Sequence, residues 1–370
     1  MKRLIPVILI FGLLLCGCSG EEEAPASIAT TQATTEATEA TTLPTEVTEP
    51  ATEDTTPTEP ATLYRNPFNG APLSEPFTGR AVTFTIGNTD EARPQYGISQ
   101  ADIFCEITVE GGLTRCMPVF SDLSNVGPIG SIRSARTYFI SISQAFDAIF
   151  LHSGASIYAA NLFNSNPVTH VNADPAIFYR DQARAAAGYA YEHRHFVNGT
   201  KTYEYLTENY DLTSPPDSNY GLGFVDEQDL QGESAATIRV NFGDGYAKAT
   251  KFTYDEAAGN YTTTLFNQSM KEEPWIDAAN NEVLRFENIL VLYEKRTGVP
   301  GATAGNVYHE LVGSNTGYYA CGGKWVSITW HRENEFEPFS FALEDGTPLN
   351  MIPGKTYIGF VPTGSPINFE

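Results

Sequence analysis

The sequence predicts an α+β protein, with an N-terminal mixed α/β domain over residues 64–225 and a second, β-rich C-terminal domain over residues 235–370. Strand-like, turn-like and helix-like segments alternate between residues 81 and 164, which is typical of layered α/β or α+β domains. Beyond about residue 237, short strand-like segments separated by Gly-containing turns indicate a β-rich fold. A polar connector rich in Pro and Gly at residues 213–223 marks the boundary.

The first 17 residues have the features of a secretion signal. Lys2 and Arg3 precede an apolar run over residues 4–15, which is too short for an ordinary membrane-spanning helix. The run ends in Leu-Cys-Gly-Cys-Ser at residues 15–19, which resembles the lipobox of bacterial lipoproteins. We therefore expect residues 1–17 to be removed and Cys18 to be lipidated. An ordinary secretory signal with incidental cysteines is the alternative.

Residues 18–63 are expected to carry the lipidated cysteine and a disordered spacer. Residues 21–62 consist mainly of Thr, Glu, Ala and Pro, with ten acidic residues and no aromatic residue, Lys or Arg. Such a segment cannot bury enough apolar surface to offset its chain entropy. The spacer would hold a folded part away from the membrane, and Thr-linked glycosylation is left open.

The formal net charge of −23 argues against a general nucleic-acid binder, which needs a basic surface to neutralise phosphates. With the lipobox-like signal, it favours a lipid-anchored protein on the outer face of the bacterial cytoplasmic membrane. The histidines at positions 193 and 195 are not accompanied by a Cys pair or a metal-binding motif. We therefore predict no metal site and no cofactor.

Hydrophobic patterning and turn residues define the elements of the N-terminal domain. Glu110-Gly111-Gly112 is expected to form a tight turn between two strands. We expect strands at residues 81–86, 102–109, 113–120 and 147–152, and helices at residues 131–146, 157–164 and 201–208.

Residues suited to a binding or catalytic site concentrate between residues 93 and 158, at predicted strand ends, Gly turns and a helix start. The ligand-binding candidates are Arg93, Gln95, Arg115, Arg133, Arg136 and His195, and the catalytic candidates are Glu110 and His152.

Arg133 and Arg136 are the strongest candidates for binding an anion. If the helix starts at Ser131, both lie near its first turn, where free N–H groups and the helix dipole favour negative charge. Guanidinium groups add bidentate recognition of carboxylate or phosphate. Equally, the two arginines could form structural ion pairs with Glu106, Glu110 or Asp102.

The acidic and histidine candidates have different expected roles. For Glu106 we favour a structural ion pair. Glu110, beside two glycines, is a candidate general base, metal ligand or arginine partner. His152 ends a predicted strand, and ligand sites in α/β sheets lie at the carboxyl ends of strands. As a lone histidine it is more often a satisfied hydrogen-bonding group.

A disulfide between Cys105 and Cys116 is a further expectation. A two-residue hairpin centred on residues 110–111 would place the two cysteines directly opposite each other. An extracytoplasmic compartment would permit the bond. A three-residue turn would shift this register.

Three functional hypotheses follow from these residues. The first is a surface lipoprotein that binds an anionic cell-envelope ligand, such as a wall-peptide carboxylate or a phosphate polymer, in an Arg/Glu/His cleft of the N-terminal domain. The second is an envelope hydrolase or transferase that uses Glu110 and His152, with the arginines stabilising negative charge. The third is a scaffold for other membrane proteins.

Several sequence blocks resemble the YerB-like bacterial lipoproteins. They are NPFNGAPL, RPQYGISQADI, VEGGLTR, GPIGSIRSAR and the C-terminal EDGTPL and PGKTYIGFVP. That family pairs an N-terminal and a C-terminal domain of unknown function behind a lipoprotein signal. The resemblance covers most of residues 64–362 and implies a fold and a location, but no enzymatic activity.

Overall fold

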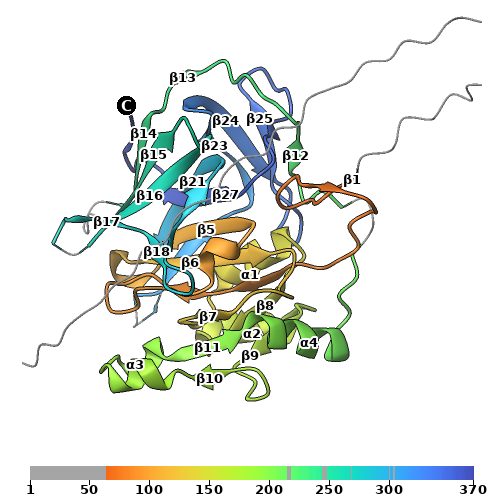
Figure 1. Cartoon of the computed structure of the whole chain (residues 1–370), viewed down its shortest axis with the longest axis vertical. Helices are drawn as coiled ribbons and strands as arrows, with labels where there is room; N and C mark the ends of the chain where they lie inside the picture. The colour runs from red at the N-terminus through yellow and green to blue at the C-terminus, as the bar shows by residue number, and fades with distance from the viewer. Residues whose placement is uncertain (1–63, 215–217, 244–247, 268, 300, 303–304) are drawn as a thin grey trace, which may run out of the picture. The chain divides into compact units, whose positions relative to one another are not determined.

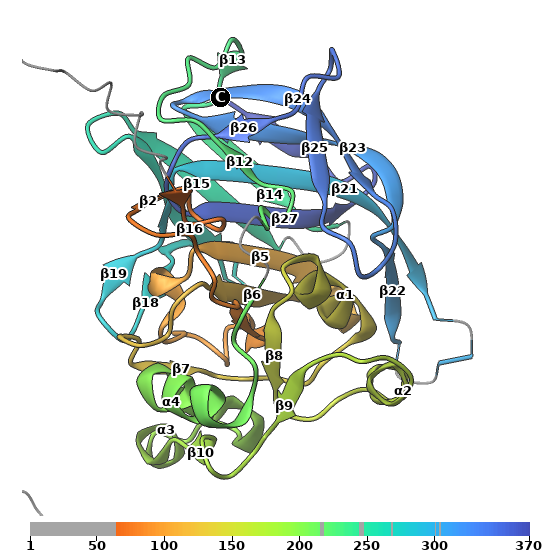
Figure 2. The same cartoon turned by 90° about the vertical axis from the view of Figure 1, so that its right-hand side faces the viewer.

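One β-sheet runs through both halves of the chain in the computed structural model (Figures 1 and 2). The structure describes residues 64–214, 218–243, 248–267, 269–299, 301–302 and 305–370. The predicted signal, Cys18 and the predicted spacer lie outside the described residues. Within the described ranges, no helix is both long enough and apolar enough to cross a membrane.

The large sheet contains thirteen strands within the described residues. In order across the sheet they are β13 (Glu233–Ser234), β24 (Lys324–Arg332), β23 (Gly313–Cys321), β21 (Asn288–Gly298), β27 (Thr356–Pro362), β5 (Ile103–Thr108), β6 (Thr114–Phe120), β3 (Val82–Phe84), β8 (Ile149–His152) and β9 (His170–Asn172). Three further strands pair with these: β22 (Val307–Glu310) with β21, β25 (Ser340–Leu343) with β24, and β4 (Ile86–Gly87) with β6.

Strand β27 joins the two halves of the sequence. It runs parallel to β21 on one side and parallel to β5 on the other, so that Thr356 lies opposite both Asn288 and Ile103. The described residues accordingly fall in one compact unit. β27, from near the C-terminus, therefore lies between β21 of the C-terminal half and β5 of the N-terminal half, and it joins them into one sheet.

Smaller sheets flank this one. A six-stranded sheet contains β17 (Glu272–Pro274), β16 (Asn260–Phe266), β15 (Ala249–Asp255), β14 (Thr237–Asn241) and β28 (Ile367–Phe369), with β20 (Arg285–Phe286) beside β16. A three-stranded sheet contains β10 (Tyr179–Arg180), β11 (His195–Asn198) and β7 (Pro128–Gly130). Three strand pairs are β1 (Tyr64–Arg65) with β2 (Pro72–Leu73), β12 (Gly223–Phe224) with β26 (Asn350–Met351), and β18 (Ile276–Asp277) with β19 (Glu282–Val283). The C-terminal part is therefore β-rich, as predicted.

The α-helices that the structure describes lie between residues 137 and 209. They are α1 (Thr137–Ala145), α2 (Ile157–Ser165), α3 (Gln182–Ala186) and α4 (Gly199–Asn209), and the 3₁₀ turns are η1 (Ile98–Gln100), η2 (Glu110–Gly112) and η3 (Tyr191–His193). The predicted helices near residues 157 and 201 are confirmed as α2 and α4. Each begins at a capping side chain, since Ser156 accepts from the backbone N–H of Ala159 and Asn198 from that of Lys201.

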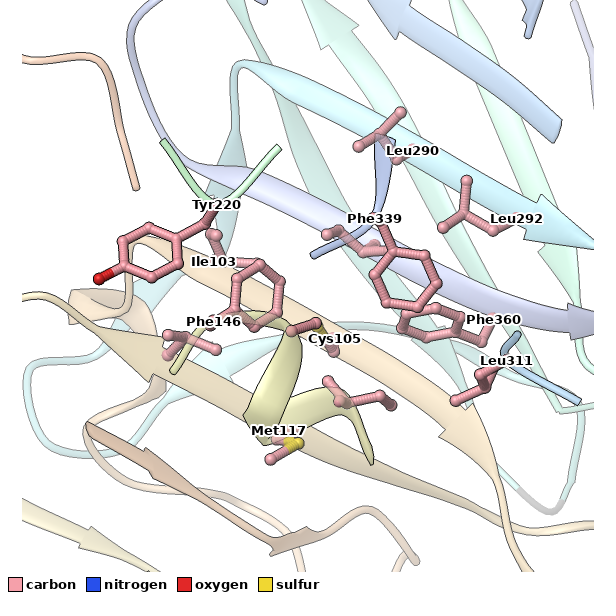
Figure 3. Close-up of a cluster of buried hydrophobic side chains, with 14 of the residues drawn as sticks. Ile103, Cys105, Met117, Phe146, Tyr220, Leu290, Leu292, Leu311, Phe339 and Phe360 are labelled. Carbon is pink, nitrogen blue, oxygen red and sulfur yellow. The ribbon is translucent and has the colours of Figure 1, made fainter. Parts of the chain in front are cut away.

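The large sheet separates two hydrophobic cores. Along β5, Ile103, Cys105 and Ile107 lie in one core and Phe104 lies in the other, because successive side chains of a strand point to opposite faces. Helix α1 covers the first core with Phe139 and its neighbours. Figure 3 shows part of this core, including Met117, Phe146, Leu290, Leu292, Phe339 and Phe360.

The predicted helix over residues 131–146 starts six residues later than expected, at Thr137. Residues 131–136 are extended because their backbone pairs with other segments. Ile132 N–H donates to His195 O, Arg133 N–H to Thr85 O, and Ala135 N–H to Gly154 O. Tertiary pairing therefore overrides the helical pattern, and Arg136 becomes the N-cap residue. The prediction that Arg133 and Arg136 share one helix is wrong.

The predicted disulfide between Cys105 and Cys116 is also wrong. The β5–β6 hairpin closes with a three-residue turn, in which Val109 N–H donates to Leu113 O. Cys105 therefore lies opposite Met117, and Cys116 lies opposite Glu106. The two thiols point to opposite faces of the sheet, into different cores, and both are free. Burial raises the pKa of each thiol well above its usual range.

Candidate functional site

A small cavity of about 190 Å³ lies where the β5–β6 hairpin meets the loop after β4. Three of the predicted site residues line it, namely Glu110, Arg115 and Arg133. The other lining residues are Gly87, Asn88, Thr89, Val109, Leu113, Thr114 and His193. The structure therefore brings two of the predicted arginines and one predicted carboxylate to a common cavity.

Arg133 is held by its backbone and by its side chain. Its backbone N–H donates to Thr85 O, and its side chain contacts turn η3. Gly87 leaves room for its side chain, since a Cβ at that position would lie 3.3 Å from Arg133 Cγ. Arg133 Nη1 donates to Glu192 O at 3.0 Å and lies 3.2 Å from His193 Nδ1. The guanidinium group is therefore tied to turn η3, which forms one wall of the cavity.

Arg115 supplies the second guanidinium group of the cavity. It lies on β6, and its Nη1 donates to Ser134 O at 2.8 Å. Burial, together with the neighbouring charges of Arg136 and Arg133, lowers the pKa of Arg115 to about 10. Burial also lowers the pKa of Arg133. An anion bound between Arg115 and Arg133 would offset both the burial and the repulsion of like charges.

Glu110 is held by Arg136. Arg136 Nε donates to Glu110 Oε1 at 2.6 Å and Arg136 Nη2 donates to Glu110 Oε2 at 3.2 Å. Asn306 Nδ2, from the residue before β22, adds a third hydrogen bond at 2.9 Å. Burial raises the pKa of Glu110, but the hydrogen bond and charge of Arg136 outweigh it and the pKa is lowered. Glu110 is therefore an ionised partner of Arg136, which suits it poorly to accept protons at neutral pH.

The charges around the cavity are unbalanced. Arg136 and Arg115 both act on the carboxylate of Glu110, and the carboxylate of Glu192 acts on Arg133. Arg136 pairs with Glu110, and the other two arginines line the cavity. This arrangement can hold a small anion by charge-assisted hydrogen bonds.

A buried polar network forms the wall behind the cavity, and Glu106 is its centre. Glu106 is fully buried and accepts four hydrogen bonds instead of pairing with an arginine. The donors are Asn88 Nδ2 (2.9 Å), Thr114 Oγ1 (2.6 Å), Thr250 Oγ1 (2.7 Å) and Tyr357 Oη (2.9 Å). The arginine ion pair favoured for Glu106 is therefore wrong, because neutral donors from both halves of the chain occupy the carboxylate.

Lys248 extends this network from the C-terminal half. It is buried, and its Nζ donates to Asn88 O at 3.0 Å. Burial lowers the pKa of Lys248, while the charge of Glu106 acts in the opposite direction. Asn88 thus lines the cavity while its side chain and its carbonyl are both fixed by buried groups.

Arg93 and Gln95 lie away from this cavity. Both line a separate hollow of about 300 Å³ together with Trp275. Arg93 is ion-paired with Asp90. Gln95 is fully buried, donates to Gly87 O and Asn88 Oδ1, and accepts from Trp275 Nε1. Gln95 therefore supports the backbone and side chain that line the anion cavity.

His152 is buried in a different environment from Glu110. Its Nδ1 lies 2.8 Å from Gly154 O, its Nε2 lies 3.0 Å from His170 Nδ1, and its ring stacks on Phe163. Burial lowers the pKa of His152 to about 4. The imidazole is therefore neutral at physiological pH and is engaged on both ring nitrogens.

His195 contacts Ser153 rather than the arginines. Its Nδ1 lies 2.5 Å from Ser153 Oγ, and its ring packs against Phe178. Burial, with the nearby charge of Arg180, lowers the pKa of His195 to about 4. His195 and His152 are both absent from the described residues that line the cavity.

A larger hollow of about 690 Å³ lies at the far edge of the large sheet, between β13 and the turn after β25. Trp325 and Ser327 line it together with the acidic residues Glu233, Glu344 and Asp345. It contains none of the predicted site residues, and its charge is opposite to that of the arginine cavity.

Sequence reasoning missed part of the cavity wall. His193 enters the sequence analysis only in the test for a metal site, and Asn88 is not among the predicted site residues. The contribution of Asn306 and Lys248 comes from more than 100 residues away, so no local pattern indicates it. The loop position of His193 is the one local signal, since binding residues are disproportionately found on loops.

Comparisons with known proteins agree with the sequence resemblance. Residues 69–210 match the N-terminal domain of DUF3048, a protein family of unknown function, and residues 238–358 match the C-terminal domain of the same family. The chain is 26% identical over 314 residues to YerB of Bacillus subtilis, which is named as a candidate lipoprotein; the match covers 80% of this chain and 88% of YerB. A crystal structure of YerB superimposes with a TM-score of 0.68 at 24% identity, over 82% of this chain and 99% of the other. The structural likeness concerns the fold alone.

Proposed function

Since this chain belongs to the DUF3048 family, whose paired domains have no assigned activity, we propose that it is a lipid-anchored cell-envelope protein that binds a small anionic group between Arg115 and Arg133. The observation that carries the proposal is the cavity itself. Two arginine side chains line it, and Glu110, the acidic residue among its described lining residues, is already paired with Arg136. The ligand class is a phosphate or carboxylate group of an envelope polymer.

The geometry favours binding over catalysis. A hydrolase that used Glu110 and His152 would need both groups near one reacting atom. Glu110 is engaged by Arg136 and Asn306, whereas His152 is engaged by His170 and a backbone carbonyl. Anion binding is therefore the function that these contacts support best.

We expect an Arg133→Gln variant to bind inorganic phosphate at least about tenfold more weakly than wild type, because a charge-assisted hydrogen bond is lost. Arg115→Gln should have a similar effect. The measurement is a calorimetric or NMR titration with phosphate and, in parallel, with acetate. Arg285→Gln is the matched control, since Arg285 pairs with Asp255 on the six-stranded sheet. If Arg133→Gln and Arg285→Gln bind both anions as wild type does, the proposed site is wrong.

The proposed anchor depends on the thiol of Cys18. We expect Cys18→Ala to release the protein from the membrane fraction or to block processing of the signal, since no thioether can form. Fractionation with and without detergent, followed by intact-mass analysis, measures this. Cys16→Ala is the control, because Cys16 stands two residues earlier in the same segment. A Cys18→Ala protein that still needs detergent for extraction would rule out the lipid anchor.

A further inference from the structure

The outer edge of strand β24 has a gap in its pairing. On that edge β13 pairs as far as Trp325, and β25 begins to pair at Ile328. Within the described residues, Val326 and Ser327 therefore face no strand on that side. The gap spans about 10 Å, because three steps of about 3.3 Å each separate its two ends.

The backbone groups of Ser327 point into this gap. The β23–β24 hairpin is closed by Cys321 opposite Lys324 around a two-residue turn, so these two residues exchange their backbone hydrogen bonds. Alternation along an antiparallel strand then directs the N–H and C=O of Ser327 away from β23. The outer side agrees with this alternation, because Ala235 N–H donates to the carbonyl of Gly323 at 2.7 Å.

The hollow of about 690 Å³ at the far edge of the large sheet lies over this gap. Trp325, Val326 and Ser327 line it from β24, and Leu343 lines it from β25. The ring of Trp325 is held by Phe369, on which it stacks at 4.2 Å between ring centres. The floor of the hollow is therefore an ordered, partly apolar surface, toward which a backbone donor and a backbone acceptor are turned.

The walls of the hollow are acidic. Glu233 of β13 stands on one side, and Glu344 and Asp345 stand on the other, in the turn after β25. The described residues that line the hollow include no Lys or Arg, and Lys324, at the start of β24, is paired with Asp229 at 3.2 Å. A positively charged partner would gain from both walls, whereas an acidic partner would be repelled.

The backbone of Ser327 favours a peptide over other cationic partners. A peptide unit carries one N–H donor and one C=O acceptor, so it matches the N–H and the C=O of Ser327 together. An amine or a metal cation can pair with the carbonyl, but it offers no acceptor to the N–H.

The two faces of the sheet edge indicate the sequence of such a peptide. Trp325 lies opposite Glu233 on one face, and Val326 and Leu343 pack on the core of the other face. Successive side chains of an added strand would point to these two faces in turn. A segment in which basic and apolar residues alternate therefore fits both.

We infer that this gap is a docking site for a basic, extended segment of a partner protein, which adds a short strand beside Ser327 and places its basic side chains against the acidic walls. The site is independent of the proposed anion site, since the described residues that line the two hollows do not overlap. The two sites also carry opposite charge, so each can be tested without the other.

The probe is a capped Lys-Val-Lys-Val-Lys peptide, titrated into the full chain by calorimetry. The comparison probes are the same peptide with Glu in place of Lys, the same peptide N-methylated at each Lys, and cadaverine. We expect the Lys peptide to bind at least about fivefold more tightly than each of them, because each lacks either the positive charge or the peptide N–H groups. Equally tight binding of cadaverine would indicate a plain cation site and overturn the peptide proposal.

Ser327→Pro tests the backbone contact. Proline removes the outward N–H and leaves the pairing with β23 in place, which an edge position tolerates. We expect the Lys peptide to bind this variant about fivefold more weakly or worse, with a nearly unchanged melting temperature. Ser327→Ala is the matched control, because it keeps the N–H and should bind as wild type does.

Glu233→Gln/Glu344→Gln tests the acidic walls without changing the backbone. It should weaken binding of the Lys peptide about fivefold at low salt, whereas Glu208→Gln/Glu256→Gln, at two exposed sites elsewhere, should not. If the Lys peptide fails to bind wild type, or binds Ser327→Pro and the Glu233/Glu344 variant as tightly as wild type, the docking site is overturned. A dimer in sedimentation that Ser327→Pro abolishes would make a second copy of the chain the occupant instead and would equally overturn the partner proposal.

Discussion

Replacing Glu106 with glutamine is expected to lower the free energy of unfolding by about 3–5 kcal/mol, the usual cost of removing one member of a buried charged group. Glu106 has no exposed surface, and each of its oxygens accepts two hydrogen bonds. Glutamine keeps the shape of the side chain but replaces one acceptor oxygen with a donor. Two of the four donors would then face an N–H group.

The substitution also removes the negative charge that most raises the pKa of Lys248. That lysine is buried, and the charge of Glu106 opposes the effect of burial on its pKa. Without the carboxylate, the burial of the charged Lys248 is compensated less, which adds to the cost. The expected loss therefore exceeds that of an ordinary buried hydrogen bond, which is about 1 kcal/mol.

Denaturant unfolding followed by tyrosine and tryptophan fluorescence measures this change. Glu256→Gln is the matched control, because Glu256 is exposed in the turn between β15 and β16. The control should lie within about 0.5 kcal/mol of wild type. A Glu106→Gln variant that is as stable as the control would show that the four hydrogen bonds do not hold the two halves of the chain together.

The second large effect is expected at Arg332, where methionine should destabilise the protein by about 3 kcal/mol or more. Arg332 is fully buried on β24. It donates to Glu337 O (2.6 Å), Ser141 Oγ (2.7 Å), Ser141 O (2.8 Å) and Glu335 O (2.8 Å). Its guanidinium also lies 4.6 Å from the centre of the Phe339 ring.

These contacts attach helix α1 to strand β24, which belongs to the other half of the chain. Burial lowers the pKa of Arg332 to about 10, so the group stays charged at neutral pH. Methionine fills a similar volume but leaves the Ser141 carbonyl and the neighbouring acceptors without donors. Lysine keeps the charge, yet its compact ammonium cannot span acceptors on two elements, and Arg332→Lys should recover only part of the loss.

Thermal and denaturant unfolding of Arg332→Met, Arg332→Lys and Arg285→Met would test these expectations. Arg332→Met should be the least stable of the three, and Arg332→Lys should lie between it and Arg285→Met. Arg285 is the matched control because its side chain is 44% exposed and pairs with Asp255 at the surface. We expect Arg285→Met to be nearly neutral. An Arg332→Met variant that unfolds at the same denaturant concentration as Arg285→Met would contradict the proposed role of the buried guanidinium group.

Local sequence patterns were sufficient for many single elements. The strand predicted at residues 147–152 is β8, and those at residues 102–109 and 113–120 are β5 and β6, because each is an apolar segment next to a Gly-containing turn. The helices near residues 157 and 201 begin directly after Ser156 and Asn198, whose side chains cap them.

The predictions failed where distant segments decide the outcome. One extra residue in turn η2 shifts the β5–β6 register, and that shift alone sends Cys105 and Cys116 to opposite faces. The first residues of the predicted helix pair with Thr85, Gly154 and His195 instead, which separates Arg133 from Arg136. The cluster of arginines was visible in the sequence, but their partners were not.

In the candidate site too, local patterns identified some residues correctly, whereas distant contacts decided the role of others. Arg115, Arg133 and Glu110 were identified from residue type and turn chemistry, and the cavity contains all three. His152 was proposed because it ends a predicted strand, yet its ring nitrogens lie against Gly154 O and His170, and the candidate His195 lies against Ser153. Strand ends thus indicate where side chains emerge, whereas charge balance and burial decide which of them remain available to a ligand.

The place of β27 in the large sheet also constrains how the chain reaches its native state. β5 is made early in synthesis, but one of its neighbours, β27, begins only at Thr356. Until that strand emerges from the ribosome, β5 and β21 each keep an open edge able to pair with another chain. Closing such a long-range parallel pairing is slow, so we expect these two edges to stay open longer during folding than the edges of local hairpins.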